Sequence, residues 1–195
     1  IGEANLLAKD FIRLSDLLNI KTKCCITYGE QPIGFTVGPA LEAREALELL
    51  SMSRSVPDLL DKACNIAGML LESVGEEDGY NIALATVKKG IALSKLKEII
   101  EAQGGDPDIK PEDVAVGGCR YTFRSTRKGV VLWIDNNSLV EAVRLLGAPK
   151  DKGAGIELHK KVGDMVEPGD PLFTLYAEKE YKLDYTIGKI EEEGL

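Results

Sequence analysis

Glu45 is the side chain whose surroundings in the sequence could support chemistry. It lies four residues after Leu41 and four before Leu49, and residues four apart share one face of a helix, so a carboxylate interrupts an apolar stripe. Two interpretations are open. In one, Glu45 is half-exposed and pairs with a neighbour or reaches water. In the other, its carboxylate folds back on the backbone carbonyls around residues 33–36 and encloses a cation with them, because hard cations take oxygen ligands.

A glycine-containing loop and a helix would position Glu45. Gly34 and Gly38 allow a close approach of the loop to the helix, and Pro39 suits the first helical position, where no N–H donor is needed and φ is already correct. A glycine loop that runs into a helix N-terminus is a general geometry for binding polar ligands. At helical spacing, one apolar face contains Ala40, Ala43, Leu47 and Leu50.

The composition excludes several classes of protein. The 195 residues carry a net charge of −8 and a pI near 4.9, without clusters of Lys and Arg, which argues against nucleic-acid binding. No apolar run approaches the length of a membrane span, and no leader peptide is recognisable. The four cysteines have no C-x-x-C spacing, so we expect a reduced, cytoplasmic protein. The chain begins at Ile1 without Met, inside a helix-like pattern, which predicts a fragment.

Residues 1–110 predict an α/β domain in which most of the sheet is missing. Apolar spacing indicates a helix over 4–18, and the short apolar run Lys23–Tyr28 indicates one strand of a buried sheet. Further helices are expected from Pro39, from Ser55–Asp58, and over 82–89 and 91–103. Because these helices follow one another without intervening strands, they would form the helical flank of a sheet whose other strands come from elsewhere.

Residues 111–195 predict a small β-rich module, so the overall fold class is α/β (α+β). Strand-like stretches are 114–116, 119–125, 130–134, 156–162, 172–177 and 185–187. Arg127–Gly129 is interpreted as the turn between the second and third of these strands. Asn136 or Asn137 would cap a helix over 139–146 that ends at Gly147.

Several motifs together resemble the thymidine and pyrimidine-nucleoside phosphorylase family, and within it the archaeal AMP phosphorylase branch. The resemblance extends over essentially the whole chain. It implies that residues 1–110 are the C-terminal part of the phosphorylase α/β domain, and that residues 111–195 are the family's C-terminal α+β hammerhead, or barrel, domain. The motifs are Pro32–Gly34, Gly38–Glu45, Ala102–Pro107, Leu146–Pro149, Lys152–Gly155 and Gly163–Leu172.

The resemblance also implies a metal site. Pyrimidine phosphorylases hold a potassium ion with two loop carbonyls and a helix glutamate, and these positions correspond to Ile33, Thr36 and Glu45 of this chain. The remaining ligands come from the phosphate-binding loop of the family. No organic cofactor is implied, and phosphate is the co-substrate. Where the family has Gly-Asn before Ala-Leu-Glu, this chain has Gly38-Pro39.

The implied activity is phosphorolysis of the N-glycosidic bond of AMP, or of CMP or UMP, to the free base and ribose 1,5-bisphosphate. Thymidine or another pyrimidine nucleoside is the alternative substrate. The family's phosphate loop and its base-binding Arg, Ser and Lys have no counterpart in this chain, so we expect no catalytic residue here and no activity from the fragment alone. The expected partners are the missing N-terminal half of the enzyme and further copies in a homo-oligomer, without nucleic acid or membrane.

A non-catalytic assembly or carrier module is the alternative from another class. Residues 163–172 resemble the hairpin of biotinyl and lipoyl carrier domains, but those domains present the modified lysine in a tight turn, and this chain offers only Lys179 in Glu-Lys-Glu. A hammerhead module without the cofactor is therefore the preferred interpretation. His159 is the only histidine and has no recognisable nucleophile partner, so it is assigned no catalytic role.

Overall fold

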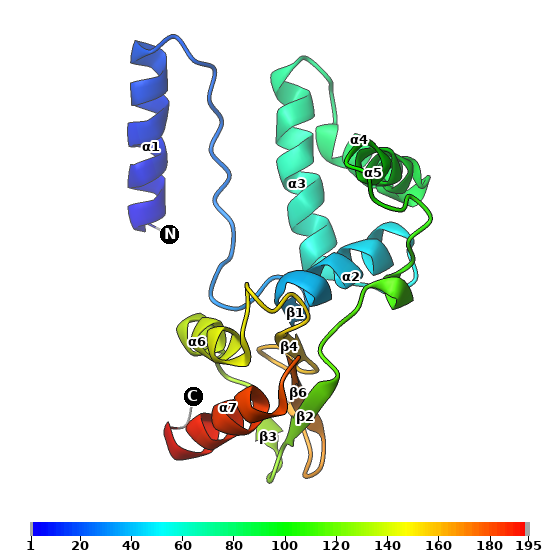
Figure 1. The fold of residues 1–195 in the computed structure, drawn as a ribbon. Coiled ribbons are helices and arrows are strands. Elements are labelled where there is room, and N and C mark those ends of the chain that lie inside the picture. The colour runs from blue at the N-terminus through cyan, green and yellow to red at the C-terminus, as the bar shows by residue number, and fades with distance from the viewer. Residues whose placement is uncertain (1, 194–195) are drawn as a thin grey trace.

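The computed structural model describes residues 2–193 and consists of a helical part joined to a smaller module built on a sheet (Figure 1). The helical part contains α1 (Gly2–Leu17), α2 (Pro39–Leu50), α3 (Pro57–Ser73), α4 (Gly79–Lys88) and α5 (Ile91–Ala102). The module contains the short helix η1 (Pro111–Asp113), strands β2 (Cys119–Arg124), β3 (Gly129–Val130), β4 (Gly155–Leu158), β5 (Met165–Val166) and β6 (Pro171–Ala177), and helices α6 (Asn136–Leu146) and α7 (Glu180–Glu193).

The module is organised around a four-stranded antiparallel sheet in the order β1-β4-β6-β2, and β3 pairs with β5 in a second small sheet. Strand β1 (Thr36–Val37) is an edge strand contributed by the loop before α2. In the described part of the chain the strands do not close into a barrel, and the mixture of helices with antiparallel sheets confirms the α+β class.

One face of the sheet and the two module helices form the main core. Alternate residues of a strand point to opposite faces, so Ile156 and Leu175 pack with Leu146 of α6 and Leu183 of α7, all buried. Along β2, Tyr121 and Phe123 alternate with Arg120, Thr122 and Arg124, as the sequence predicts, and Thr122 pairs with Thr174 on the polar face. This polar face continues toward β1 and α2.

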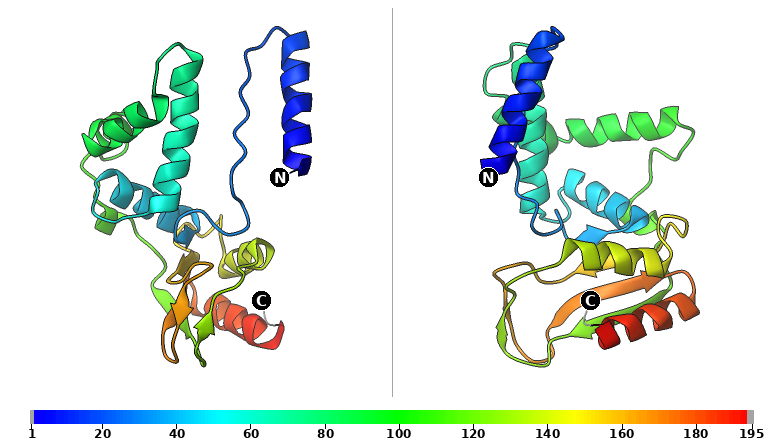
Figure 2. Two further views of the ribbon diagram at one scale, coloured as in Figure 1. Left: turned by 180° about the vertical axis from the view of Figure 1, so that it is seen from behind. Right: turned by 90° about the vertical axis from the view of Figure 1, so that its left-hand side faces the viewer.

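Among residues 2–110, no buried cluster is comparable to this core. Ser15 is the buried residue of α1, whereas Leu6, Phe11 and Leu14 on the same helix are each more than half exposed. Figure 2 shows α1 standing apart from the other helices at the end of an extended segment. Helices α3 and α4 do meet, since Gly68 and Gly79 lie in contact through their backbones. Among residues 2–193, no helix combines the length and apolarity needed to cross a bilayer.

Two predicted strands and one predicted turn are wrong here, and a further strand is shorter than predicted. Lys23–Tyr28 is extended and largely exposed, but it has no paired neighbour and forms no strand, because a strand needs a partner for its backbone groups. Residues 114–116 also remain unpaired. Arg127–Gly129 does not close a hairpin between adjacent strands, since β2 pairs with β6 and β3 with β5, and 131–134 continues as loop beyond β3.

The predictions at two module helices also need correction. The predicted strand 185–187 lies inside α7, where Leu183, Ile187 and Ile190 follow helical spacing toward the core. Helix α6 is capped by Asp135, whose carboxylate accepts hydrogen bonds from the backbone N–H groups of Asn137 and Ser138, in place of the predicted asparagine cap. Gly147 ends this helix with φ of 120°, as expected.

Candidate functional site

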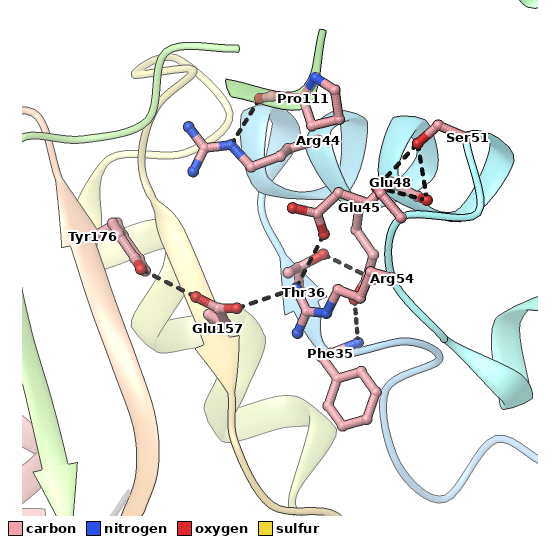
Figure 3. Close-up of polar contacts among 11 residues, drawn as sticks. Phe35, Thr36, Arg44, Glu45, Glu48, Ser51, Arg54, Pro111, Glu157 and Tyr176 are labelled. Carbon is pink, nitrogen blue, oxygen red and sulfur yellow. Dashed lines mark hydrogen bonds and ion pairs between the residues drawn. The ribbon is translucent and has the colours of Figure 1, made fainter. Parts of the chain in front are cut away.

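Glu45 is buried, with 3% of its surface exposed, and its carboxylate folds back on the loop before α2 (Figure 3). Its Oε1 accepts a hydrogen bond from the backbone N–H of Phe35 at 2.9 Å, and its Oε2 accepts one from Thr36 Oγ1 at 3.0 Å. The half-exposed interpretation of Glu45 is therefore wrong. The structure brings Thr36 and Glu45 into contact through the Thr36 hydroxyl and not through the backbone carbonyl predicted as a ligand, and Ile33 is 38% exposed.

Gly34 and Gly38 make this close approach feasible. A Cβ at Gly34 would lie 2.3 Å from Glu45 Oε2, and the φ of Gly34 is +69°, a conformation that L side chains rarely adopt. A Cβ at Gly38, whose φ is +131°, would lie 2.4 Å from the carbonyl oxygen of Ala154. Gly34 therefore allows the predicted close approach of the loop to the helix, whereas Gly38 allows a close approach to the backbone of Ala154 just before β4.

The backbone of Thr36 lies at the free edge of the sheet. Leu158 N–H donates to the carbonyl of Phe35 at 2.6 Å, and Thr36 is the partner of Glu157 in the ladder. Residues that exchange hydrogen bonds alternate with residues that do not in an antiparallel pair. The Thr36 carbonyl therefore points away from β4.

The charge of Glu45 has no direct counter-ion in the described part of the chain. None of the ion pairs found among residues 2–193 includes Glu45. A buried carboxylate is costly unless hydrogen bonds or a cation compensate it. The two hydrogen bonds compensate part of this cost, and each oxygen retains a lone pair for a further partner. Such a donor set fits a bound cation.

The chemistry of the donors limits which cation could bind. Within residues 2–193, no three His, Cys, Asp or Glu side chains gather closely enough to hold a metal ion. A cation beside Glu45 would therefore take most of its ligands from backbone carbonyls, which suits a weakly charged ion better than a transition metal. The set Ile33, Thr36 and Glu45 remains a predicted potassium site.

A second network surrounds this loop and was not predicted. Arg54, just beyond α2, pairs with Glu48 of α2 and with Glu157 of β4, both at 3.2 Å, and Tyr176 of β6 donates to Glu157 at 3.1 Å (Figure 3). Burial lowers the pKa of Arg54, but its hydrogen bond to Glu48 and the charges of Glu157, Glu48 and Glu45 outweigh this and raise it. Burial and the Glu157 charge raise the pKa of Tyr176.

The N-terminus of α2 is already engaged within the chain. The Gly38 N–H donates to Glu42 Oε1 at 2.8 Å, and the Ala40 N–H donates to the carbonyl of Lys152 at 3.0 Å. Both contacts satisfy donors that a helix start leaves unpaired. The helix start was predicted to suit a polar ligand. Its N–H donors instead bind Glu42 in the first turn of α2 and the loop before β4.

His159, Lys179 and the four cysteines were also singled out from the sequence. His159 Nε2 lies 2.8 Å from Thr174 Oγ1, which gives the histidine a structural partner. Lys179 lies between β6 and α7 and outside the hairpin that follows β4. The cysteines Cys24, Cys25, Cys64 and Cys119 are all free.

Sequence reasoning also missed Lys161, whose ammonium binds the loop from the β4–β5 connection. It is separated from the loop by more than a hundred residues and belongs to no motif. Asp58, which accepts from the Gly34 N–H at 3.1 Å, is recognisable in the sequence only as part of a helix start. Neither contact has a local sequence signal.

Comparison with known proteins gives the same family that the motifs indicate. Residues 130–193 match the pyrimidine nucleoside phosphorylase C-terminal domain. AMP phosphorylase of Pyrococcus furiosus is 53% identical over 188 residues, which cover 95% of this chain and 37% of that protein. AMP phosphorylases of Thermococcus kodakarensis and Methanococcoides burtonii are 50% and 44% identical, over 96% and 98% of this chain and 38% of each protein.

The chain thus spans 37–38% of the length of these three relatives. The part that matches includes the C-terminal domain of the family. These matches confirm the resemblance predicted from the sequence: the chain is similar to AMP phosphorylases over 95% of its length, and residues 130–193 match the C-terminal domain of pyrimidine nucleoside phosphorylases.

Proposed function

We propose that this chain is the C-terminal part of a phosphorylase that cleaves the N-glycosidic bond of AMP, CMP or UMP with phosphate. The products would be the free base and ribose 1,5-bisphosphate. The observation that carries the proposal is the similarity to AMP phosphorylases over 95% of the chain at 53% identity. The exposed apolar faces of α1 and of the segment that follows it also support a part of a longer protein, since such faces are normally covered.

In this proposal, the chain supplies a cation-binding loop to an active site completed by the rest of the enzyme. A bound potassium ion would provide positive charge near the phosphate co-substrate. Glu45 fixes the loop through Phe35 and Thr36, and the ladder register directs the Thr36 carbonyl away from β4. Ile33 and Thr36 would contribute backbone carbonyls, and Glu45 its carboxylate.

Preorganisation is the physical reason for holding the loop so firmly. Charge grows on the departing base in an oxocarbenium-like transition state, and fixed charges and dipoles stabilise it without reorganising during the reaction. A loop held by a buried carboxylate and required glycines meets this need. No side chain of this chain is assigned a chemical step.

The first experiment measures phosphate consumption by the full-length protein with AMP and with thymidine, each with potassium and with a large organic cation in its place. We expect AMP turnover that potassium stimulates. Thymidine turnover without AMP turnover would move the proposal to a pyrimidine-nucleoside phosphorylase. Turnover with neither substrate would contradict the proposal and favour a non-catalytic assembly module.

Glu45→Gln tests the cation site itself. In the full-length enzyme this variant should weaken both phosphate affinity and the response to potassium, because it removes the charge that would hold the ion. Glu42→Gln is the matched control, since Glu42 lies on the same helix, is exposed and only caps the Gly38 N–H. Unchanged phosphate affinity and potassium dependence in Glu45→Gln would refute the assignment of Ile33, Thr36 and Glu45.

The separate chain of residues 1–195 should have no phosphorolysis activity, and detectable activity with AMP or thymidine would contradict this part of the proposal. We also propose a cytoplasmic homo-oligomer that binds no nucleic acid; the free cysteines and the acidic charge support the compartment and the lack of nucleic acid, respectively. A lysine adduct on Lys179, found by mass spectrometry of natively expressed protein, would favour the carrier alternative.

A further inference from the structure

The positively charged ammonium group of Lys161 binds the loop that precedes β1. Lys161 lies in the connection between β4 and β5, yet its ammonium donates to the backbone carbonyls of Pro32 and Gly34. The same nitrogen lies 3.1 Å from Asp58 Oδ2 at the start of α3, and the Lys161 side chain is only 12% exposed. A single ammonium therefore joins the module, the loop and the helical part.

The oxygen atoms around this ammonium match its bonding capacity. An ammonium group has three N–H donors, and three oxygen atoms accept from it or pair with it, namely the two carbonyls and the Asp58 carboxylate. Asp58 Oδ2 also accepts from the Gly34 N–H at 3.1 Å, which fixes the carboxylate relative to the loop. The ring centroid of Phe35 lies 5.3 Å from the nitrogen, within the range of a cation–π contact.

We propose that Pro32 O, Gly34 O and the Asp58 carboxylate form a binding site for a monovalent cation, which Lys161 fills with its own ammonium. Two carbonyl dipoles and a single negative charge balance one positive charge, and carbonyl oxygens are the donors that replace the hydration shell of potassium-sized ions. Lys161 is then a positioning residue, because its tethered cation fixes the loop segment that carries Ile33 between Pro32 and Gly34.

This site is distinct from the one proposed beside Glu45. The Lys161 cage uses the carbonyls on either side of Ile33, whereas the Glu45 site would use Ile33 itself and the Thr36 carbonyl. Phe35 lies next to both, since its N–H donates to Glu45 and its ring faces the Lys161 ammonium. The tethered cation would therefore set the geometry in which the second, exchangeable cation binds, and this consequence rests on the proposed function.

Replacing Lys161 by Ala should open the cage to a free cation. We would compare the thermal unfolding midpoint of the full-length Lys161→Ala variant in ammonium, potassium and tetramethylammonium chloride at equal ionic strength. Ammonium and potassium should raise the midpoint of the variant by about 2–4 °C more than they raise that of the wild type, because a ligand bound by the folded state stabilises it. Tetramethylammonium is too large to enter and serves as the reference.

Three control proteins separate this effect from general salt stabilisation. Lys161→Met loses the charge but keeps a stem in the cage, so it should be destabilised without selective recovery. Lys160→Ala removes the neighbouring lysine, which contacts Met165 and Asp170, and should show no ammonium preference. The double variant Glu45→Gln/Lys161→Ala should retain the selective response, which distinguishes the cage from the Glu45 site.

The proposal is overturned if Lys161→Ala responds to ammonium and potassium no more than the wild type does, or if it stays unfolded in every salt. Its catalytic consequence has a separate readout in the full-length enzyme. There Lys161→Ala should raise the potassium concentration needed for half-maximal activation at least tenfold. Added ammonium should lower this concentration part of the way back toward the wild-type value. Selective recovery of stability in a protein without phosphorolysis would refute the proposed function and leave the cage intact.

Discussion

Glu45 provides the sharpest test of the structure, because its two hydrogen bonds predict an order of stability among variants. In Glu45→Gln, the amide oxygen can still accept from the Phe35 N–H, and the amide nitrogen can donate to Thr36 Oγ1, since a hydroxyl both donates and accepts. Each bond then changes from a charge-assisted bond of about 1.5–3 kcal/mol to a neutral one of about 0.5–1.5 kcal/mol. The neutral side chain is easier to bury, so the net cost should be about 1 kcal/mol.

Glu45→Ala should cost considerably more. It removes both acceptors, leaves the Phe35 N–H without its partner, and opens a space below Gly34. A lost charge-assisted pair together with an unsatisfied donor gives about 3–5 kcal/mol. The free energy of unfolding would be measured by urea denaturation in a tetramethylammonium buffer, so that no bound potassium contributes. Equal destabilisation of the Gln and Ala variants would refute the proposed hydrogen bonding of Glu45.

Thr36→Val completes a double-mutant cycle with Glu45→Gln. Alone, it removes one donor to the carboxylate and should cost about 1.5–3 kcal/mol. In the Gln background it also removes the acceptor that the amide nitrogen needs, so the two effects should not add, and the coupling energy should exceed about 0.5 kcal/mol. Strict additivity would mean that Thr36 and Glu45 do not contact each other in solution.

Two further predictions concern stability. Gly34→Ala should cost more than about 2 kcal/mol in urea denaturation, because φ is +69° and the new Cβ would lie 2.3 Å from Glu45 Oε2, whereas Gly29→Ala, with open space around it, should be near neutral. The hydrogen bond from Lys182, 2.7 Å away, lowers the pKa of Asp151, so the stability it contributes is present above the unfolded pKa of about 3.9 and is lost as the pH falls toward the lowered folded pKa. Asp151→Asn should remove this part of the acid dependence of the unfolding midpoint. If the midpoint of the variant fell at acidic pH as steeply as that of the wild type, the prediction would be contradicted.

Local signals account for much of the fold. Pro39 and Gly38 predict the start of α2, Gly90 separates α4 from α5, and alternation places Tyr121 and Arg120 on opposite faces of β2. Each of these signals acts within a few residues, so its effect does not depend on contacts with distant parts of the chain. Strand pairing is different, because β1 and β4 are more than a hundred residues apart, and no local pattern specifies the partner.

The errors have the same origin. Lys23–Tyr28 has the composition of a buried strand but lies unpaired in this chain, and Tyr185–Ile187 has β-branched and aromatic residues whose burial follows a helical period instead. The capping error at α6 arose because asparagine and aspartate have similar preferences, and only the contacts of Asp135 decide between them.

At the candidate site, the sequence predicted the carboxylate but not what surrounds it. The apolar stripe through Leu41 and Leu49 indicated that Glu45 would be unusual, and both leucines are buried with it. Lys161 reaches the loop through a tertiary contact that depends on how β4 pairs with β1, which no spacing rule encodes. If this pairing holds the loop against α2, then loop, edge strand and module must fold together, and a substitution in the module at Lys161 should disturb cation binding beside Glu45 although the two residues share no contact.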